Sequence, residues 1–222
     1  MGERLLIWAS LIKLLVKRIN SKFRNKEYVD FGLPSGLKWA KCNVGAEKET
    51  DYGYYFMWGS TTPNTKTECT WKYAPFNNGS DLYAEEYFAT HKSEWLDDND
   101  NLKPEYDAAY KVTNGIARMP THEDFQELLD NTINEWIEDF NGSRVNGRKF
   151  TGSNGNYIFI PASGGRSVSS FRSQGYDGYI WSSSLNASNP NYAWYLGFFS
   201  DYCGMGHYGR RCVGFVVRGV MD

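Results

Sequence analysis

Side chains capable of redox, nucleophilic or metal-binding chemistry are few in this 222-residue chain and lie far apart. The four cysteines form no CxxC pair; they are Cys42, Cys69, Cys203 and Cys212. The three histidines lack the spacing of metal ligands; they are His91, His122 and His207. A structural zinc site requires four such ligands in close pairs. We therefore predict no metal and no cofactor, and reduced cysteines, although their even number leaves disulfides open outside a cell.

Two acidic groupings also bear on chemistry. The run Asp97 to Asp100 lacks the glycine and the distal glutamate of an EF-hand loop, so we predict a solvated loop rather than a calcium site. His122 and Glu123 fall in the first turn of a predicted helix, where an acidic side chain stabilises the positive end of the helix dipole. We interpret this pair as structural and predict no catalytic residues.

The composition is that of a folded globular protein, with 41% hydrophobic and 23% charged residues. The net charge of −2 argues against a nucleic-acid-binding protein, because neutralising phosphates requires a basic surface. Aromatic residues make up 17% of the chain. Tyr and Trp provide large contact areas at a low cost in conformational entropy. The aromatic content therefore indicates either a binding surface or an aromatic-rich β core.

The first 26 residues differ from the rest of the chain. Their apolar run, Leu5 to Val16, is too short to span a bilayer, and the basic stretch after it contains no small-residue cleavage site. Apolar residues at spacings of three and four predict one face of an amphipathic helix: Leu5, Trp8, Ile12, Leu15 and Ile19. We expect residues 1–26 to mediate self-association or docking into a larger assembly. Packing on its own domain and binding at a membrane surface are the alternatives.

Residues 27–222 predict one domain of short strands, few helices and long loops. We expect two strands around a Pro/Gly turn within 28–40 and others at 52–58, 148–150, 157–160 and 213–220. The region from 60 to 105 reads as mostly irregular. Asn146-Gly147 and Asn154-Gly155 are hairpin signals. The capping-box spacing of Thr121 and Asp124 predicts a helix that ends near Asn131.

The segment from Tyr192 to Asp201 alternates as a strand does. Trp194, Leu196 and Phe198 point one way and are uniformly large and apolar, as a core face requires. The opposite side mixes aromatic, glycine and acidic residues, a combination that no packing requirement would select. We therefore predict that the region of about 175–218 displays a ligand-binding surface.

Several motifs together resemble a known family. They are Tyr28–Gly36, Trp39-Ala40, Asn43–Ala46, Tyr52-Gly53, Phe56, Trp58-Gly59, Arg118–Thr121, Phe125, Leu128, Trp181–Ser184 and Gly214–Arg218. They resemble the major paralogous domain common in anaerobic gut bacteria and their phages. That domain is related to the formylglycine-generating-enzyme type of C-type lectin fold, and variable proteins of diversity-generating retroelements are similar to it. The resemblance implies an α+β, C-type-lectin-like fold over residues 27–222 with a variable region near the C-terminus.

In such retroelements a reverse transcriptase mutates template adenines, so AAC and AAT codons diversify most. These codons never yield Lys, Glu, Gln, Met or Trp, which excludes Met205. The resemblance thereby implies ligand-binding roles for residues of the permitted types: Tyr176, Asp177, Tyr179, Ile180, Tyr192, Tyr195, Gly197, Phe199, Asp201, Tyr202, Gly204, Gly206, His207, Tyr208, Gly209, Cys212 and Val213.

The enzymatic and sugar-binding branches of the fold carry other motifs. The oxidase branch uses a closely spaced cysteine pair, whereas Cys203 and Cys212 are nine residues apart. Calcium-dependent lectins use Glu-Pro-Asn and Trp-Asn-Asp, which Asn189-Pro190-Asn191 matches only imperfectly. We therefore expect no enzyme but a receptor-binding protein or adhesin of a phage tail or cell surface, whose partner is a protein or glycan on a target cell. A structural virion component and a formylglycine-generating-type oxidase are the alternatives.

Overall fold

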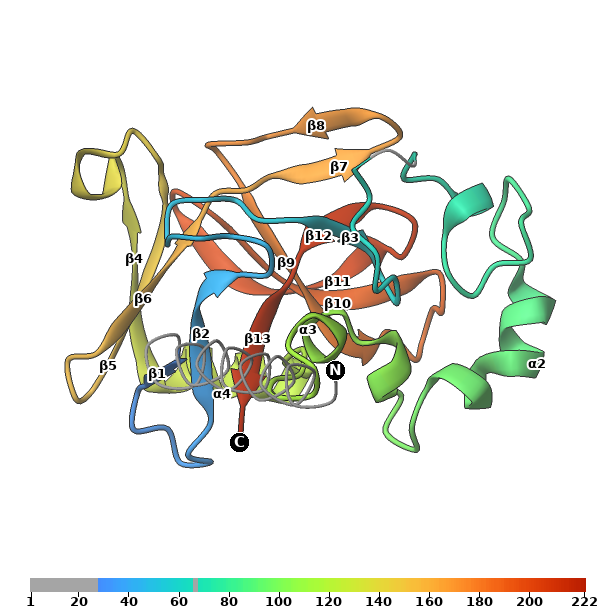
Figure 1. Cartoon of the computed structure of the whole chain (residues 1–222), viewed down its shortest axis with the longest axis horizontal. Helices are drawn as coiled ribbons and strands as arrows, with labels where there is room; N and C mark the ends of the chain where they lie inside the picture. Colours follow the sequence, from blue (N-terminus) through green and yellow to red (C-terminus); the bar gives the residue numbers. More distant parts are fainter. Residues whose placement is uncertain (1–27, 66–67) are drawn as a thin grey trace, which may run out of the picture.

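Short, mostly antiparallel strands make up most of the regular secondary structure in a computed structural model, which describes residues 28–65 and 68–222 (Figure 1). The described chain contains thirteen strands in three sheets and three α-helices. It is therefore an α+β protein rich in β-sheet, as the sequence predicted. The amphipathic helix predicted for residues 1–26 lies outside the described residues.

A seven-stranded sheet occupies the centre, in the order β11-β10-β9-β12-β7-β8 with β3 also paired to β12. Its strands are β3 (Tyr55–Met57), β7 (Gly165–Ser167), β8 (Ser170–Arg172), β9 (Gly178–Leu185), β10 (Tyr192–Phe199), β11 (Tyr202–Arg210) and β12 (Gly214–Val216). Every pair is antiparallel except β9 with β12. In this order β11 is an edge strand of the sheet.

Two three-stranded sheets flank the central one. The first, in the order β1-β2-β13, contains β1 (Tyr28–Asp30), β2 (Lys38–Asn43) and β13 (Arg218–Met221). The second contains β4 (Thr132–Ile137), β5 (Gly147–Gly152) and β6 (Tyr157–Pro161). The pairing of β2 with β13 joins the beginning of the described chain to its C-terminal end. The predicted strand over 213–220 is in fact two strands in different sheets, because the Val217 carbonyl between them bonds to the Val44 amide instead.

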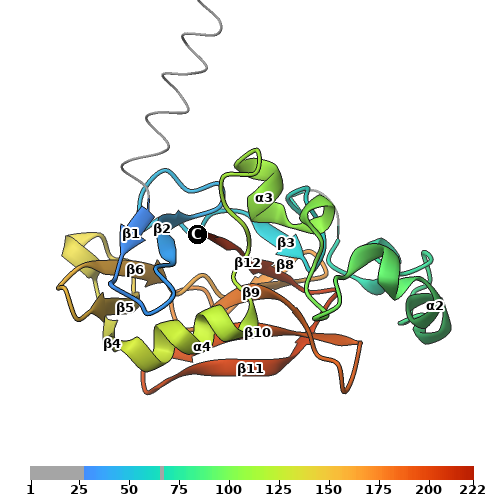
Figure 2. The same cartoon turned by 90° about the horizontal axis from the view of Figure 1, so that it is seen from below.

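The helices are α2 (Glu85–Trp95), α3 (Ala108–Val112) and α4 (His122–Asn131), with the 3-10 turns η1 (Trp71–Tyr73), η2 (Pro104–Tyr106) and η3 (Phe140–Gly142). The predicted capping box at Thr121 is confirmed: its side chain accepts from the Asp124 amide at 3.1 Å, and Asp124 accepts from the Thr121 amide at 2.8 Å. Helix α4 lies across β9, β10 and β11 (Figure 2).

Helix α2 corrects the prediction of an irregular region from 60 to 105. It buries only Phe88 and Trp95, so no apolar stripe marks it in the sequence. It lies at the opposite end of the molecule from the sheet of β4, β5 and β6 (Figure 1).

The two Asn-Gly signals have different outcomes. Gly155 lies in the turn between β5 and β6 with φ of +82°, as predicted. Asn146-Gly147 is not a hairpin turn, because Gly147 is the first residue of β5 and pairs with Ile137 and Pro161. A Cβ atom there would lie 2.2 Å from the Ile160 carbonyl oxygen, so the glycine permits close packing.

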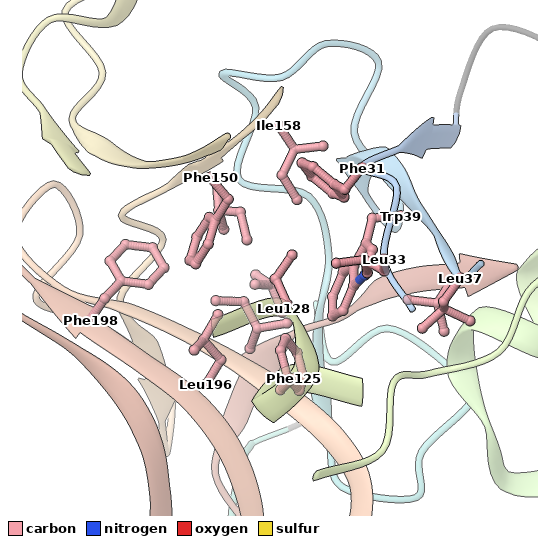
Figure 3. Packing of buried hydrophobic residues seen from close by; sticks show 14 of the residues in the cluster. Phe31, Leu33, Leu37, Trp39, Phe125, Leu128, Phe150, Ile158, Leu196 and Phe198 are labelled. Atoms are coloured by element: carbon pink, nitrogen blue, oxygen red, sulfur yellow. The ribbon is translucent and has the colours of Figure 1, made fainter. Parts of the chain in front are cut away.

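One of two large hydrophobic clusters lies between α4 and parts of all three sheets (Figure 3). Phe125 and Leu128 of α4 point toward Leu196 of β10 and Phe150 of β5, and each of the four is fully buried. A second buried cluster connects α2 and Trp58 to Trp181 and Phe215 of the central sheet. The two clusters lie on opposite faces of β9 and β10. These two strands are therefore held by packing on both sides.

Candidate ligand-binding surface

The face of β10 that packs on α4 follows the predicted alternation closely. Leu196 pairs with Ile180 and Met205, and both Leu196 and Phe198 are buried in the cluster around α4. Trp194, predicted to share that core, is only partly buried. A register shift between Ala193 and Tyr195 lets it reach the first residue of α4, where its ring centroid is 4.3 Å from that of His122. A bulge of this kind leaves no mark in the sequence pattern.

The opposite face of β10 and β11 consists of aromatic rings laid over glycines. A Cβ atom at Gly206 would lie 2.3 Å from Cζ of Tyr195, and one at Gly204 would lie 2.8 Å from the Tyr202 hydroxyl. The Tyr195 ring also leaves no room for a larger residue at Gly197, where a Cβ atom would lie 2.9 Å from its Cε2. Packing under the Tyr195 ring therefore explains Gly197 and Gly206, contrary to the interpretation of the sequence, whereas the atom nearest Gly204 is the end of an exposed side chain. The glycines let tyrosine rings lie close to the sheet.

Tyr179, Tyr195 and Phe215 continue this aromatic layer across β9 and β12. The ring of Tyr179 stacks on Phe215 at 4.9 Å and meets Tyr195 edge-on at 5.8 Å between centroids. The Tyr179 hydroxyl donates to Oδ2 of Asp177 at 2.9 Å. Burial, and then the bond and negative charge of Asp177, raise the pKa of Tyr179. Asp177 thus fixes the orientation of a tyrosine that stays protonated at physiological pH.

Four aromatic side chains are exposed on β10, on β11 and just before β9. They are Tyr176 (75% exposed), Tyr208 (68%), Tyr202 (45%) and Phe199 (43%). Phe199 and Tyr202 stack at 5.2 Å between centroids, with 24° between their planes. Exposed Asp201 lies between them in sequence. Clustered exposed aromatic rings are typical of binding surfaces, because they bury large areas while losing little side-chain freedom.

Other residues predicted for the surface are partly buried: Asp177, Tyr179, Tyr192, Tyr195, Gly204, Gly206 and Val213. Of these, Tyr192 contacts the exposed Tyr208 edge-on, with centroids 5.6 Å apart. His207 belongs to β11, but its side chain lies outside the described part of the molecule.

Four predicted surface residues are buried, which corrects their assignment. Ile180 is fully buried beside Leu196 in the core under α4. Cys212 is buried with Met57 and Cys69. Gly197 and Gly209 are also buried. The ring of Tyr195 covers Gly197, and the rings of Tyr195 and Trp181 cover Gly209. The permitted codon set restricts the type of residue but not whether its side chain is buried, so it could not exclude these positions.

Arg148 is a residue of this surface that sequence reasoning placed only within a strand. From β5 it reaches the turn between β10 and β11, where Nη1 donates to the carbonyls of Phe199 at 2.8 Å and Tyr202 at 3.1 Å. Its Nε donates to Oδ1 of Asn134 at 2.8 Å. The contact joins segments about fifty residues apart, and no local sequence signal marks it.

Three of the four cysteines pack into or against hydrophobic clusters of the described chain. Cys203 packs against the core under α4, whereas Cys212 and Cys69 belong to a separate buried cluster. Burial raises the pKa of Cys69 and of Cys203 to about 11, and also raises that of Cys212. A reactive cysteine requires the opposite shift, since the thiolate is the nucleophile.

These shifts predict slow thiol chemistry and a loss of stability at alkaline pH. At pH 8 a pKa raised from 9.0 to about 11 lowers the thiolate fraction about a hundredfold. We expect Cys69 and Cys203 to react with Ellman's reagent about a hundredfold more slowly in native than in urea-unfolded protein. Because the folded pKa exceeds the unfolded one, their contribution to stability is complete below pH 9 and is lost between pH 9 and 11.

The measurement uses a Cys42→Ser variant, so that the partly exposed Cys42 thiol does not add to the signals of Cys69 and Cys203. A Cys203→Ser variant should flatten part of the alkaline decline in the free energy of unfolding. Equal labelling rates in native and unfolded protein would contradict the assignment.

Metal and membrane signals are absent from the residues described. Within 28–65 and 68–222, no group of three or more His, Cys, Asp or Glu side chains could hold a metal ion. No helix of that part is long and apolar enough to cross a membrane. Comparisons with protein-family models, with curated proteins and with solved structures found no match.

Proposed function

We propose that this protein binds a protein or glycan on a target cell through the aromatic surface of β10 and β11. The observation that carries the proposal is the stacked, exposed pair Phe199 and Tyr202, presented by strands that are buried on the face toward α4. Binding energy concentrates in a few aromatic anchors on a firm support. The partly exposed Tyr179 and Tyr195 extend the aromatic area beside this pair.

A C-type-lectin-like fold of the retroelement-diversified type is part of the same proposal. The short antiparallel strands, the few helices and the long segments between β3 and α4 support it. So does the location of most permitted-codon residues on one pair of strands, β10 and β11. In this view the protein is a receptor-binding component of a phage tail or an adhesin of a cell surface, and its exposed side chains change while the strands remain.

Cell binding tests the proposal directly. The fluorescently labelled full chain is mixed with intact cells of a panel of anaerobic gut bacteria, and bound protein is measured by flow cytometry. Replacing both Phe199 and Tyr202 with Ala should weaken binding at least about thirtyfold, which corresponds to about 1 kcal/mol for each anchor. Protease treatment of the cells abolishes binding to a protein ligand, and periodate oxidation abolishes binding to a glycan.

The matched control replaces Ile133 and Tyr157 with Ala. Both are exposed and both pair with Thr151 of β5, in a sheet separate from that of β10 and β11, so this variant should bind as the parent does. The proposal fails if no cell type retains the parent protein, or if the two double variants bind equally.

A further inference from the structure

The turn that carries the exposed pair contains only Ser200 and Asp201 between β10 and β11. Phe199 and Tyr202 are the last backbone partners of the hairpin. Two-residue hairpin loops favour turn types with positive φ, usually supplied by Gly or Asn, because these match the twist of the strands. Neither Ser200 nor Asp201 has a positive φ. The turn therefore is not of the types that best match the twist of the strands.

Arg148 supplies a contact from outside the hairpin. A single nitrogen, Nη1, donates to the carbonyl oxygens on both sides of the turn, those of Phe199 and Tyr202. The other end of the interaction is fixed as well, because Nε donates to Asn134 on β4. Charge-assisted hydrogen bonds of this kind are stronger than neutral ones. The guanidinium thus connects the hairpin to a second sheet.

We propose that Arg148 is a positioning residue for ligand binding, which holds the Phe199 and Tyr202 rings in one arrangement before the ligand arrives. The inference rests on the proposed function of this surface. A ligand that meets an ordered pair loses less entropy on binding than one that must order a mobile turn. Arg148 itself need not touch the ligand, since its donors are directed at the hairpin carbonyls and at Asn134.

The side-chain chemistry specifies arginine at this position. The planar guanidinium presents several donors in a fixed fork, so one side chain can serve Asn134 and the two carbonyls together. An Arg148→Lys substitution keeps the charge but presents a single rotatable ammonium. The lysine variant should therefore lie between the parent and Arg148→Met in every measurement.

Hydrogen exchange followed by mass spectrometry measures, without any ligand, how firmly Arg148 holds the turn; we call these hydrogen bonds from Arg148 to the carbonyls of Phe199 and Tyr202 the clamp. In Arg148→Met we expect amide exchange within residues 199–204 to be about tenfold faster than in the parent, which corresponds to the loss of about 1.4 kcal/mol of local stability. Lys149→Met is the matched control. Lys149 lies on the same strand, but it contacts Glu135 and the ring of Tyr157 instead, so exchange at the turn should not change.

The second readout is binding to the bacterial cells that retain the parent protein. Arg148→Met should weaken binding about tenfold, and Lys149→Met should leave it unchanged. If Arg148→Met does not fold, Asn134→Ala replaces it, because that variant keeps the guanidinium and removes only its anchor. It should show the same changes to a smaller degree.

The outcomes separate this proposal from the one it rests on. Unchanged exchange at residues 199–204 overturns the clamp whether or not any cell is bound. Faster exchange with undiminished binding overturns the positioning role while the proposed function stands. Faster exchange without binding of the parent to any cell refutes the proposed function and the binding role with it.

Discussion

Replacing Arg211 with Ala should lower the free energy of unfolding by about 4 kcal/mol, the largest effect we expect from any single substitution. The Arg211 side chain is fully buried. Its guanidinium carbon lies 4.2 Å from the ring centroid of Phe88 and 5.4 to 5.8 Å from three further aromatic rings, those of Tyr83, Trp71 and Trp58. Truncation would leave a large cavity among these rings.

Hydrogen bonds add to the cost of this change. Nε of Arg211 donates to the carbonyl of Pro190 at 2.7 Å, and Nη1 donates to that of Pro75 at 3.3 Å. Both partly buried carbonyls would lose a donor in the Ala variant, which adds to the cost. Burial lowers the pKa of Arg211 to about 10, so the guanidinium remains charged at neutral pH. Cation–π attraction to the surrounding rings then offsets part of its lost hydration.

Urea denaturation under reducing conditions measures the effect, with Arg210→Ala as the control. Arg210 is the preceding residue and is exposed, so its replacement should change the free energy of unfolding by less than about 0.5 kcal/mol. In the Arg211 variant, hydrogen exchange should rise most between residues 68 and 95, since the surrounding rings come from that segment and from Trp58. A loss below about 1 kcal/mol would show that the segment is held by other contacts.

The sequence predicted those parts of the fold that depend on local chemistry. Thr121 and Asp124 specify the start of α4 through their own hydrogen bonds, and Leu196 and Phe198 alternate because a strand alternates. Arg211 carried no such signal. It lies within a run of glycines and polar residues, and its aromatic partners are more than a hundred residues away.

The candidate surface was predictable in outline for the same reason. The sequence predicted it within about residues 175–218, a region that contains β10 and β11, and Phe199 and Tyr202 are exposed there. It could not distinguish Ile180, which faces α4, from Tyr179, which faces away, because this depends on where β9 pairs with β10. Register is a property of long-range pairing, and so is the contact between Arg148 and the turn.

Two glycines of β11 provide the sharpest test of which surface positions can vary. A Cβ atom at Gly209 would lie 2.6 Å from Cζ3 of Trp181 and 2.8 Å from Cδ1 of Tyr195. Trp181 is fully buried, and its Nε1 donates to the Phe56 carbonyl at 2.8 Å, so the ring cannot move aside. We expect Gly209→Ser to lower the free energy of unfolding by about 3 kcal/mol through overpacking.

Gly204→Ser is the matched substitution on the same strand. The atom that its Cβ would approach most closely is the hydroxyl of Tyr202, at 2.8 Å, and this is the free tip of an exposed side chain. Neither glycine has a positive φ, so the difference between the two variants is steric alone. The Gly204 variant should lose less than about 0.5 kcal/mol in the same urea titration.

Serine is among the residues that an AAC or AAT codon can yield, so the two variants also address diversification. If the surface is diversified as we propose, Gly204 lies where new side chains can be displayed, and Gly209 lies where most of them would unfold the strand. Equal stability of both serine variants would contradict the steric argument. A stable Gly209 variant with a displaced Trp181 would return Gly209 to the set of variable positions. The boundary of the binding surface therefore depends on whether the ring beneath each position can move.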